Sequence, residues 1–292
     1  MRKEGLRRLN VNGVLKFLGV SRSGYNSFKK RGINPTKTQI RKQRIMKLIK
    51  EIYHKSHEIY GAPKIWRELL KQGEKLSQKT VGNYMREMGI KAHYIRPYTV
   101  TTIDSDFDTR LKNILNSRFN PENPNSYWCT DITYISTDQG FCYLTTIMDL
   151  FSRRIISWRL SETLEAKWAI ECVIEAKKTR RITRPMIIHS DRGSQYVSEG
   201  YLKALANIEA SYSSKANPWH NACIESFHAL IKREWIYRFK IKDYFMAYSL
   251  VFEYIEAFYN TVRSHSHCDY QSPKQYEDYY YSRLEQSYAK VI

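Results

Sequence analysis

The sequence predicts an α/β protein in two parts, an all-helical N-terminal region followed by a mixed β-sheet covered by helices. Residues 1–100 show short helical patterns broken by turn signals and no strand-like alternation. After a Pro- and Asn-rich linker at 117–127, three consecutive β-rich runs give way to alternating helices and strands. With 292 residues, of which 42% are hydrophobic, the chain is long enough for two domains and a sizeable core.

The N-terminal region carries two sets of helix signals. Apolar residues of the segment 40–53 recur at i, i+3, i+4 and i+7, which is the stripe of a helix packed on one side. Ser21 and Ser77 are placed to cap the helices that follow them. We therefore expect helix-turn-helix units over about 11–31 and 40–90, built from helices at 11–18, 21–30, 40–53, 64–70 and 77–88.

Positive charge is concentrated in this helical region. The whole chain has a formal net charge of +19, and residues 1–100 hold 24 Lys and Arg against 6 Asp and Glu. The helix pattern alone fits a protein-interaction domain equally well, but the charge favours nucleic acid over an anionic membrane. We expect residues 1–116 to bind DNA, with the last helix in the major groove. The side chains predicted to contact DNA are Lys64, Gln78, Lys79, Asn83 and Arg86.

The second part alternates between strand and helix patterns. We expect a catalytic core over 128–240 and a helical C-terminal extension over 241–292. The predicted strands cover 128–135, 141–148, 154–160, 185–189 and 209–213, and the predicted helices 164–178, 199–206, 221–238 and 243–260. Three strands in a row followed by strand–helix alternation are typical of a mixed sheet with helices on its faces.

Cysteine usage and hydropathy exclude several classes of protein. The five Cys residues form no CxxC pair, so they indicate neither a disulfide framework nor a zinc ribbon. No run of about 18 apolar residues occurs, which argues against a membrane span and against secretion. We expect a cytoplasmic protein without a membrane partner.

Two aspartates stand where strand formation does not explain them. Asp131 lies in the middle of a predicted strand, although Asp is a poor strand former. Asp191 closely follows the predicted strand at 185–189, and strand ends are where sites form in α/β folds. Taken singly, each has an ordinary interpretation, an edge or bend residue for Asp131 and a turn or N-cap for Asp191.

Glu225 lies on the predicted helix 221–238 and shares one face with His228 and Lys232 at the i+3 and i+7 positions. At about 1.5 Å per residue, Lys232 lies about 10 Å from Glu225, too far for a direct bond. We expect Lys232 to be exposed and to contact DNA, and His228 to be a surface residue. A surface with ordinary ion pairs is the alternative.

The three acids lie within motifs that together resemble the catalytic core of DDE transposases and retroviral-type integrases, above all the OrfB transposase of the insertion-sequence-three family. These motifs are Trp128-Cys-Thr-Asp-Ile-Thr-Tyr-Ile, His189-Ser-Asp-Arg-Gly-Ser-Gln-Tyr and Asn221-Ala-Cys-Ile-Glu-Ser-Phe. Similar motifs begin at Gly19 and Tyr60, upstream of the core, and at Tyr259 and Tyr270, downstream of it. The resemblance therefore covers nearly the whole chain.

The resemblance implies an RNase H-like core in which Asp131, Asp191 and Glu225 form a catalytic, metal-binding triad, with Lys232 close to the DNA of the element's end. Between Asp191 and Glu225 lie 33 residues, two fewer than is usual in the family, and we expect the shortening near 205–208. Converging carboxylates repel one another unless cations neutralise them, so an all-oxygen site implies two Mg²⁺ ions, with Mn²⁺ as a substitute. The His and Cys spacing gives no zinc module.

The expected function is that of a bacterial transposase, associated with the nucleoid, that cleaves insertion-sequence ends and joins them to DNA. Its implied partners are double-stranded DNA, further copies of the chain assembled on that DNA, and a helix-turn-helix protein from an upstream reading frame, by fusion or association. Two other functions fit the residues: a structure-selective endonuclease of the same fold, and a DNA-binding regulator without catalysis.

Overall fold

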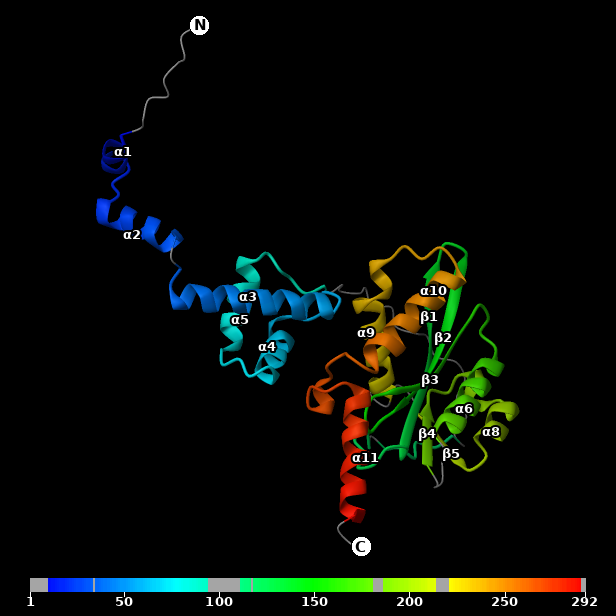
Figure 1. Cartoon of the computed structure of the whole chain (residues 1–292). Helices are drawn as coiled ribbons and strands as arrows, with labels where there is room; N and C mark the ends of the chain where they lie inside the picture. Colours follow the sequence, from blue (N-terminus) through cyan, green and yellow to red (C-terminus); the bar gives the residue numbers. More distant parts are fainter. Residues whose placement is uncertain are drawn as a thin grey trace. The chain divides into compact units, whose positions relative to one another are not determined.

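The computed structural model describes residues 10–33, 35–93, 111–116, 118–180, 186–213 and 221–289. The chain divides into two compact units, Met1–Lys91 and Ala92–Ile292 (Figure 1). This division falls before the expected boundary at residue 116, because the stretch 111–116 packs on the second unit. There the backbone N–H groups of Ile114 and Leu115 both donate to Ser211 Oγ at 2.9 Å.

The first unit is entirely helical in its described part, as expected. Helices α1 (Val11–Phe17) and α2 (Arg22–Ile33) are mostly exposed, whereas α3 (Lys37–Lys55), α4 (Ala62–Lys71) and α5 (Gln78–Glu87) pack around a small apolar core. Thr36 and Gln39 cap α3 reciprocally, and Ser77 caps α5 as predicted. The core residues, all at most 2% exposed, are Ile45, Ile49, Ile65, Leu69 and Val81.

The second unit is built on a five-stranded mixed sheet with the order β3-β2-β1-β4-β5. The strands are β1 (Tyr127–Thr137), β2 (Gly140–Asp149), β3 (Ile155–Ser161), β4 (Met186–Ser190) and β5 (Ile208–Tyr212). The first three strands form an antiparallel meander, and β1, β4 and β5 run parallel. The α/β class predicted from the sequence is therefore confirmed, with all five predicted strands present.

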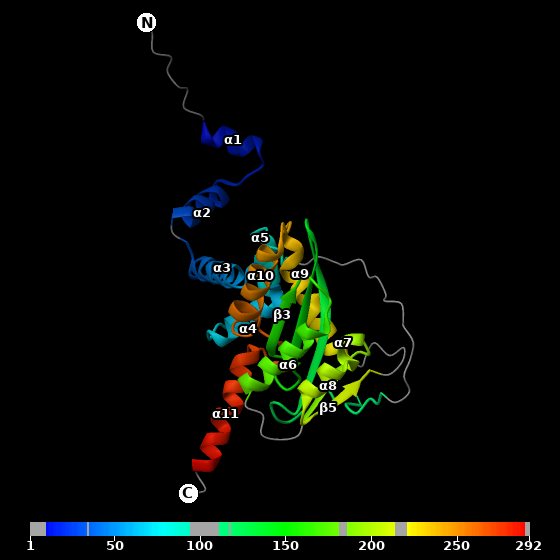
Figure 2. The same cartoon turned by 90° about the vertical axis from the view of Figure 1, so that its right-hand side faces the viewer.

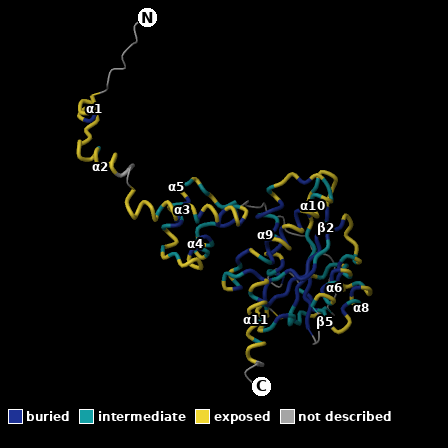
Figure 3. Tube along the Cα trace, viewed as in Figure 1, coloured by how far each residue is buried: buried dark blue, intermediate teal, exposed yellow. Residues whose placement is uncertain are grey.

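Helices cover both faces of this sheet (Figure 1). On one face, α6 (Ala166–Arg180), α7 (Ser194–Val197) and α8 (Glu199–Leu205) enclose a core that includes Trp128, Val173 and Tyr201. Figure 2 shows α7 and α8 beside β5, to which α8 is joined by only Ala206 and Asn207. On the opposite face, α9 (Ala222–Glu234) lies across β1. The buried residues follow the strands, seen in dark blue in Figure 3.

Two long helices predicted from the sequence are interrupted. The predicted helix 221–238 ends as α9 at Glu234, where Trp235 leaves helical geometry, and a 3₁₀ turn at Ile236–Arg238 follows. The predicted helix 243–260 is α10 (Tyr244–Phe252), which widens into a π-helix at Glu253–Tyr259. A further 3₁₀ turn (Ser266–Cys268) leads to α11 (Pro273–Ala289).

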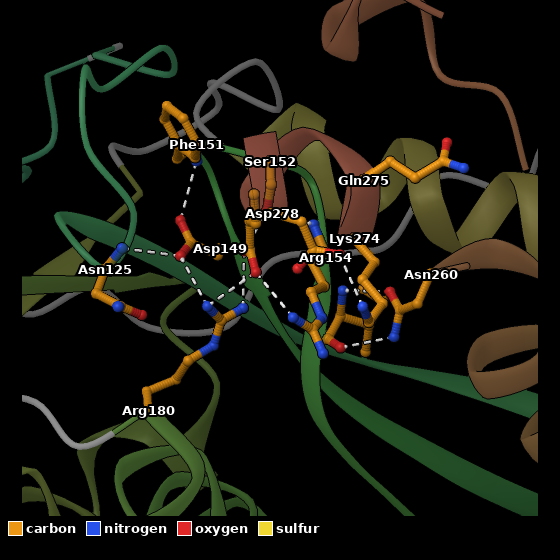
Figure 4. Close-up of polar contacts among 12 residues, drawn as sticks. Asn125, Asp149, Phe151, Ser152, Arg154, Arg180, Asn260, Lys274, Gln275 and Asp278 are labelled. Atoms are coloured by element: carbon orange, nitrogen blue, oxygen red, sulfur yellow. Dashed lines mark hydrogen bonds and ion pairs between the residues drawn. The ribbon is translucent and has the colours of Figure 1, made fainter. Parts of the chain in front are cut away.

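The C-terminal extension is tied to the sheet by buried polar contacts. Asn260 pairs with the edge of β3, because its Oδ1 accepts from the Ile155 N–H at 3.0 Å and its Nδ2 donates to the Ile155 carbonyl at 2.9 Å. Glu277 of α11 is 1% exposed and forms ion pairs with Arg154 and Arg180. Figure 4 shows these two arginines close to Asp149. No helix within the described ranges combines the length and apolar character needed to cross a membrane.

Candidate active site

The register of two parallel strands brings Asp131 and Asp191 together. Strand β4 pairs with the beginning of β1, and their last pair is Cys129 with His189. Asp131 and Asp191 each lie two residues beyond this pair, Asp131 on β1 and Asp191 directly after β4, so they lie at the same level. Since β4 ends at Ser190, the edge of β1 beyond this point is open toward the loop that begins with Asp191.

Asp191 is fixed at the start of that loop by a short turn. The N–H of Gly193 donates to its Oδ1 at 2.9 Å, in the Asx-type bond by which aspartate orders a turn. Loss of hydration, and after it the negative charge of Asp131, raises the pKa of Asp191 to about 6. Its carboxyl group therefore lies close enough to Asp131 for the two charges to repel each other.

Glu225 reaches the same region from helix α9. Ile224, Phe227 and Ile231 are buried, as the predicted stripe requires, and Glu225 lies in the first turn, exposed. Partial loss of hydration raises its pKa, and the charges of Asp131 and Asp191 raise it further. The three predicted acids thus share one electrostatic environment, in which the charge of Asp131 disfavours ionisation of the other two.

Oxygen donors of this kind suit magnesium. Within the described ranges, no three His, Cys, Asp or Glu side chains are gathered as a ready-made metal cage. Magnesium does not require one, because it is usually held by one or two carboxylates together with water and substrate phosphate. Loss of hydration raises the pKa of Asp191 and Glu225, and repulsion between the carboxylates raises it further. A bound divalent cation would relieve that repulsion, so the residues fit the ion.

The expectation that His228 is a surface residue was wrong. His228 is 5% exposed, and its Nδ1 lies 3.3 Å from Asp131 Oδ2. Its Nε2 lies 2.8 Å from the hydroxyl of Thr146, which is itself completely buried. The i+3 spacing from Glu225 predicts that the two residues share a helix face, but no local pattern indicates that β1 and β2 lie beneath His228.

Lys232 also differs from its predicted environment. It is half-buried rather than exposed, with Nζ 4.3 Å from the ring centroid of Tyr134 on β1. This distance is typical of a cation–π contact. Burial lowers the pKa of Lys232, and the charge of Asp131 opposes the shift. The Lys232 ammonium group is therefore close enough to Asp131 for their opposite charges to attract.

The predicted DNA-contacting residues of the first unit lie on α4 and α5. Lys79, Asn83 and Arg86 are exposed, and their spacing of four and three residues places them on one face of α5. Arg86 Nη1 donates to Asn83 Oδ1 at 3.2 Å. Gln78 is exposed at the first position of α5, and Lys64 is half-buried on α4, with Nζ 4.9 Å from the Tyr60 ring centroid.

Comparison with known families identifies both units. Residues 41–98 match an HTH-like domain, and residues 121–218 and 206–273 each match an integrase core domain. An integrase core behind a helix-turn-helix-like domain defines a DDE-type polynucleotidyl transferase, and the expected RNase H-like core is confirmed.

Among curated proteins, the transposase for insertion sequence element IS904 of Lactococcus lactis is 35% identical, over 84% of this chain and 98% of its own. Transposase InsF for insertion sequence IS3A of Escherichia coli is 33% identical, over 92% of this chain and 94% of its own. The chain belongs to this family, the IS3-type insertion-sequence transposases. A solved simian T-cell lymphotropic virus intasome is similar over 78% of this chain and 73% of its own, with 16% identity and a TM-score of 0.44.

Proposed function

We propose that Asp131, Asp191 and Glu225 are the catalytic carboxylates of this transposase, and that they hold two Mg²⁺ ions, for which Mn²⁺ can substitute. The observation that carries the proposal is geometric: the β1–β4 register brings Asp131 level with Asp191, and α9, which carries Glu225, lies across β1. Loss of hydration, and after it the charge of Asp131, raises the pKa of both other acids. Perturbed carboxylates in one region are the usual mark of a site that binds a cation or transfers protons.

The chemistry follows from where these residues lie. Bound divalent ions would activate a water or 3′-hydroxyl oxygen and stabilise the leaving oxygen of an in-line phosphodiester displacement. Asp131, on a paired strand, and Asp191, held by its turn, supply fixed carboxylates. Glu225 supplies the third from the first turn of α9, and Lys232, on the same helix, is positioned to meet a DNA phosphate.

This activity requires partners for both units. The substrate is double-stranded DNA, namely the ends of the insertion sequence and the target, and the exposed face of α5 is the proposed reader of the ends. We also propose that copies of the chain assemble on DNA, fused to or associated with an upstream helix-turn-helix protein. The site of action is the cytoplasm of a bacterium, at the nucleoid.

The test is end cleavage and joining by full-length protein with labelled element ends, with and without Mg²⁺. Asp131→Asn, Asp191→Asn and Glu225→Gln should each lower both steps by at least about a hundredfold, with DNA affinity within about twofold of wild type. The matched control is Glu209→Gln, an exposed acid on β5.

The two alternative functions give different outcomes. Mg²⁺-dependent cutting without joining would indicate a nuclease, and binding without either reaction would indicate a regulator. Full activity of one triad variant would remove that residue from the site.

A further inference from the structure

His228 contacts two residues that are neighbours on adjacent strands of the sheet. Asp131 of β1 and Thr146 of β2 are direct partners in the antiparallel register, so their side chains stand side by side beneath α9. The imidazole of His228 spans this pair, with Nδ1 3.3 Å from Asp131 Oδ2 and Nε2 2.8 Å from Thr146 Oγ1. Nε2 of the buried ring thus makes a hydrogen bond, and Nδ1 lies in contact with the carboxylate.

The chemistry of the two partners sets the direction of these bonds. An ionised carboxylate only accepts hydrogen bonds, so the tautomer that suits this contact carries its proton on Nδ1, facing Asp131. Nε2 is then an acceptor, and the Thr146 hydroxyl is its donor. Thr146 therefore fixes both the ring orientation and the tautomer that Asp131 needs.

We propose that His228 is a positioning residue for Asp131: by holding Oδ2 it fixes the carboxylate so that Oδ1 is presented to the divalent cation. The inference rests on the proposed function, because it gives Asp131 the part of a metal ligand. A carboxylate with one oxygen already bonded loses less rotamer freedom when it binds a cation. Partners that orient metal ligands in this way typically change metal affinity by 10–100-fold when they are removed.

Three substitutions of His228 separate this role from simple packing. The amide nitrogen of asparagine can occupy the place of Nδ1, whereas the longer glutamine places its amide near Nε2. His228→Asn therefore keeps a donor for Asp131 and gives up Thr146, and His228→Gln does the opposite. His228→Leu fills the space and makes neither bond. A role in filling the core, or in holding Thr146, would not favour asparagine.

The first measurement is binding of Mn²⁺ alone to full-length protein, followed by electron paramagnetic resonance of the free ion. We expect His228→Leu and His228→Gln to weaken Mn²⁺ binding by about tenfold or more. His228→Asn should stay within about threefold of wild type. The Mg²⁺ concentration for half-maximal joining should shift in the same order, with the rate at saturating Mg²⁺ much less affected.

A further variant acts on the other ring nitrogen of His228. Thr146→Val keeps the shape of the side chain but removes the hydroxyl that orients His228, so it should weaken Mn²⁺ binding by about threefold. This result tests the inference even if His228→Leu fails to fold. Equal Mn²⁺ affinity in all variants, or rescue by glutamine rather than asparagine, would overturn the positioning role.

Asp131→Asn separates failure of this inference from failure of the proposed function. If Asp131→Asn loses Mn²⁺ binding and joining while His228→Leu and Thr146→Val behave as wild type, only the positioning role is wrong. If Asp131→Asn itself keeps both properties, the catalytic assignment is wrong and His228 has nothing to position.

Discussion

Glu277 and Arg180 form a two-point ion pair, although 97 residues separate them in the sequence: Arg180 Nη2 lies 2.9 Å from Oε1 and Nη1 lies 3.1 Å from Oε2. Arg154 Nη1 adds a contact to Oε2 at 2.8 Å, and the Ser152 hydroxyl donates to Oε1 at 2.6 Å. These partners hold the pKa of Glu277 below its ordinary value in spite of burial. The Glu277 carboxylate thus connects α11 to the turn between β2 and β3 and to α6.

Removing that carboxylate should destabilise the core. Glu277→Gln keeps the size of the side chain but removes the counter-charge of Arg154 and leaves Arg180 with the longer contact to Asp149 at 4.0 Å. Breaking a buried pair on one side typically costs about 3–5 kcal/mol. We expect a clear fall in the free energy of unfolding, measured by urea denaturation. The neighbouring Asp278 is exposed and pairs with Lys274 of the preceding turn at 2.7 Å, so Asp278→Asn should cost less than about 0.5 kcal/mol. Equal losses would mean that the position of α11 does not depend on Glu277.

A second buried acid of this region should give stability a measurable pH dependence. Asp149 is fully buried, and burial raises its pKa to about 6 against an ordinary value of 3.8. The folded protein therefore holds the proton more tightly than the unfolded chain. The contribution of this residue to stability is complete below about pH 4 and is lost as the pH rises to about 6.

The comparison that checks this is wild type against Asp149→Asn, whose side chain stays neutral throughout. Two pKa units correspond to about 3 kcal/mol, so the unfolding free energy of wild type should fall by that order relative to the variant between pH 4 and 7. Other groups titrate in both proteins and cancel. A difference that stays constant with pH would show that the Asp149 carboxyl is not perturbed.

Residues with local signals were predicted well, and residues with distant partners were not. Strand β1, the caps at Ser21 and Ser77 and the buried stripe of α9 follow from spacings within one element. The environment of His228 depends on Thr146, 82 residues away, and on which face of α9 meets the sheet. Sequence periodicity defines a face but does not say what covers it, which is why Lys232 was also expected to be exposed.

Binding of duplex DNA should depend on one face of α5. Lys79→Ala and Arg86→Ala each remove an exposed cation from that face, and Lys50→Ala removes one from the exposed side of α3. If α5 contacts the DNA backbone, each α5 variant should weaken binding and lower the slope of log affinity against log salt by about one, because one fewer counterion is released. The measurement is a salt titration of full-length protein on end DNA. Equal effects of all three variants would indicate only bulk attraction.

The last prediction concerns Lys232 of α9, whose ammonium group interacts with the charge of Asp131. Lys232→Met keeps an unbranched side chain against the Tyr134 ring but removes the charge. Thermal stability should therefore change little, while end-DNA affinity and joining rate should both fall about tenfold or more, because the phosphate loses a half-buried cation. The control is Lys203→Met on α8, whose side chain is 75% exposed and pairs with Glu199 at 2.6 Å. It removes the same charge and should alter neither property by more than about twofold.

Lys232→Glu should behave differently from Lys232→Met, because it places another carboxylate near Asp131, whose charge already favours the ammonium form of Lys232. It should lower the melting temperature as well as joining, an effect that a solvated surface position would not show. Differential scanning fluorimetry of the two variants without DNA makes this comparison directly. Equal melting temperatures for Lys232→Glu and Lys232→Met would place the ammonium in solvent, away from Asp131. Undiminished joining by Lys232→Met would mean that the DNA does not pass this end of α9.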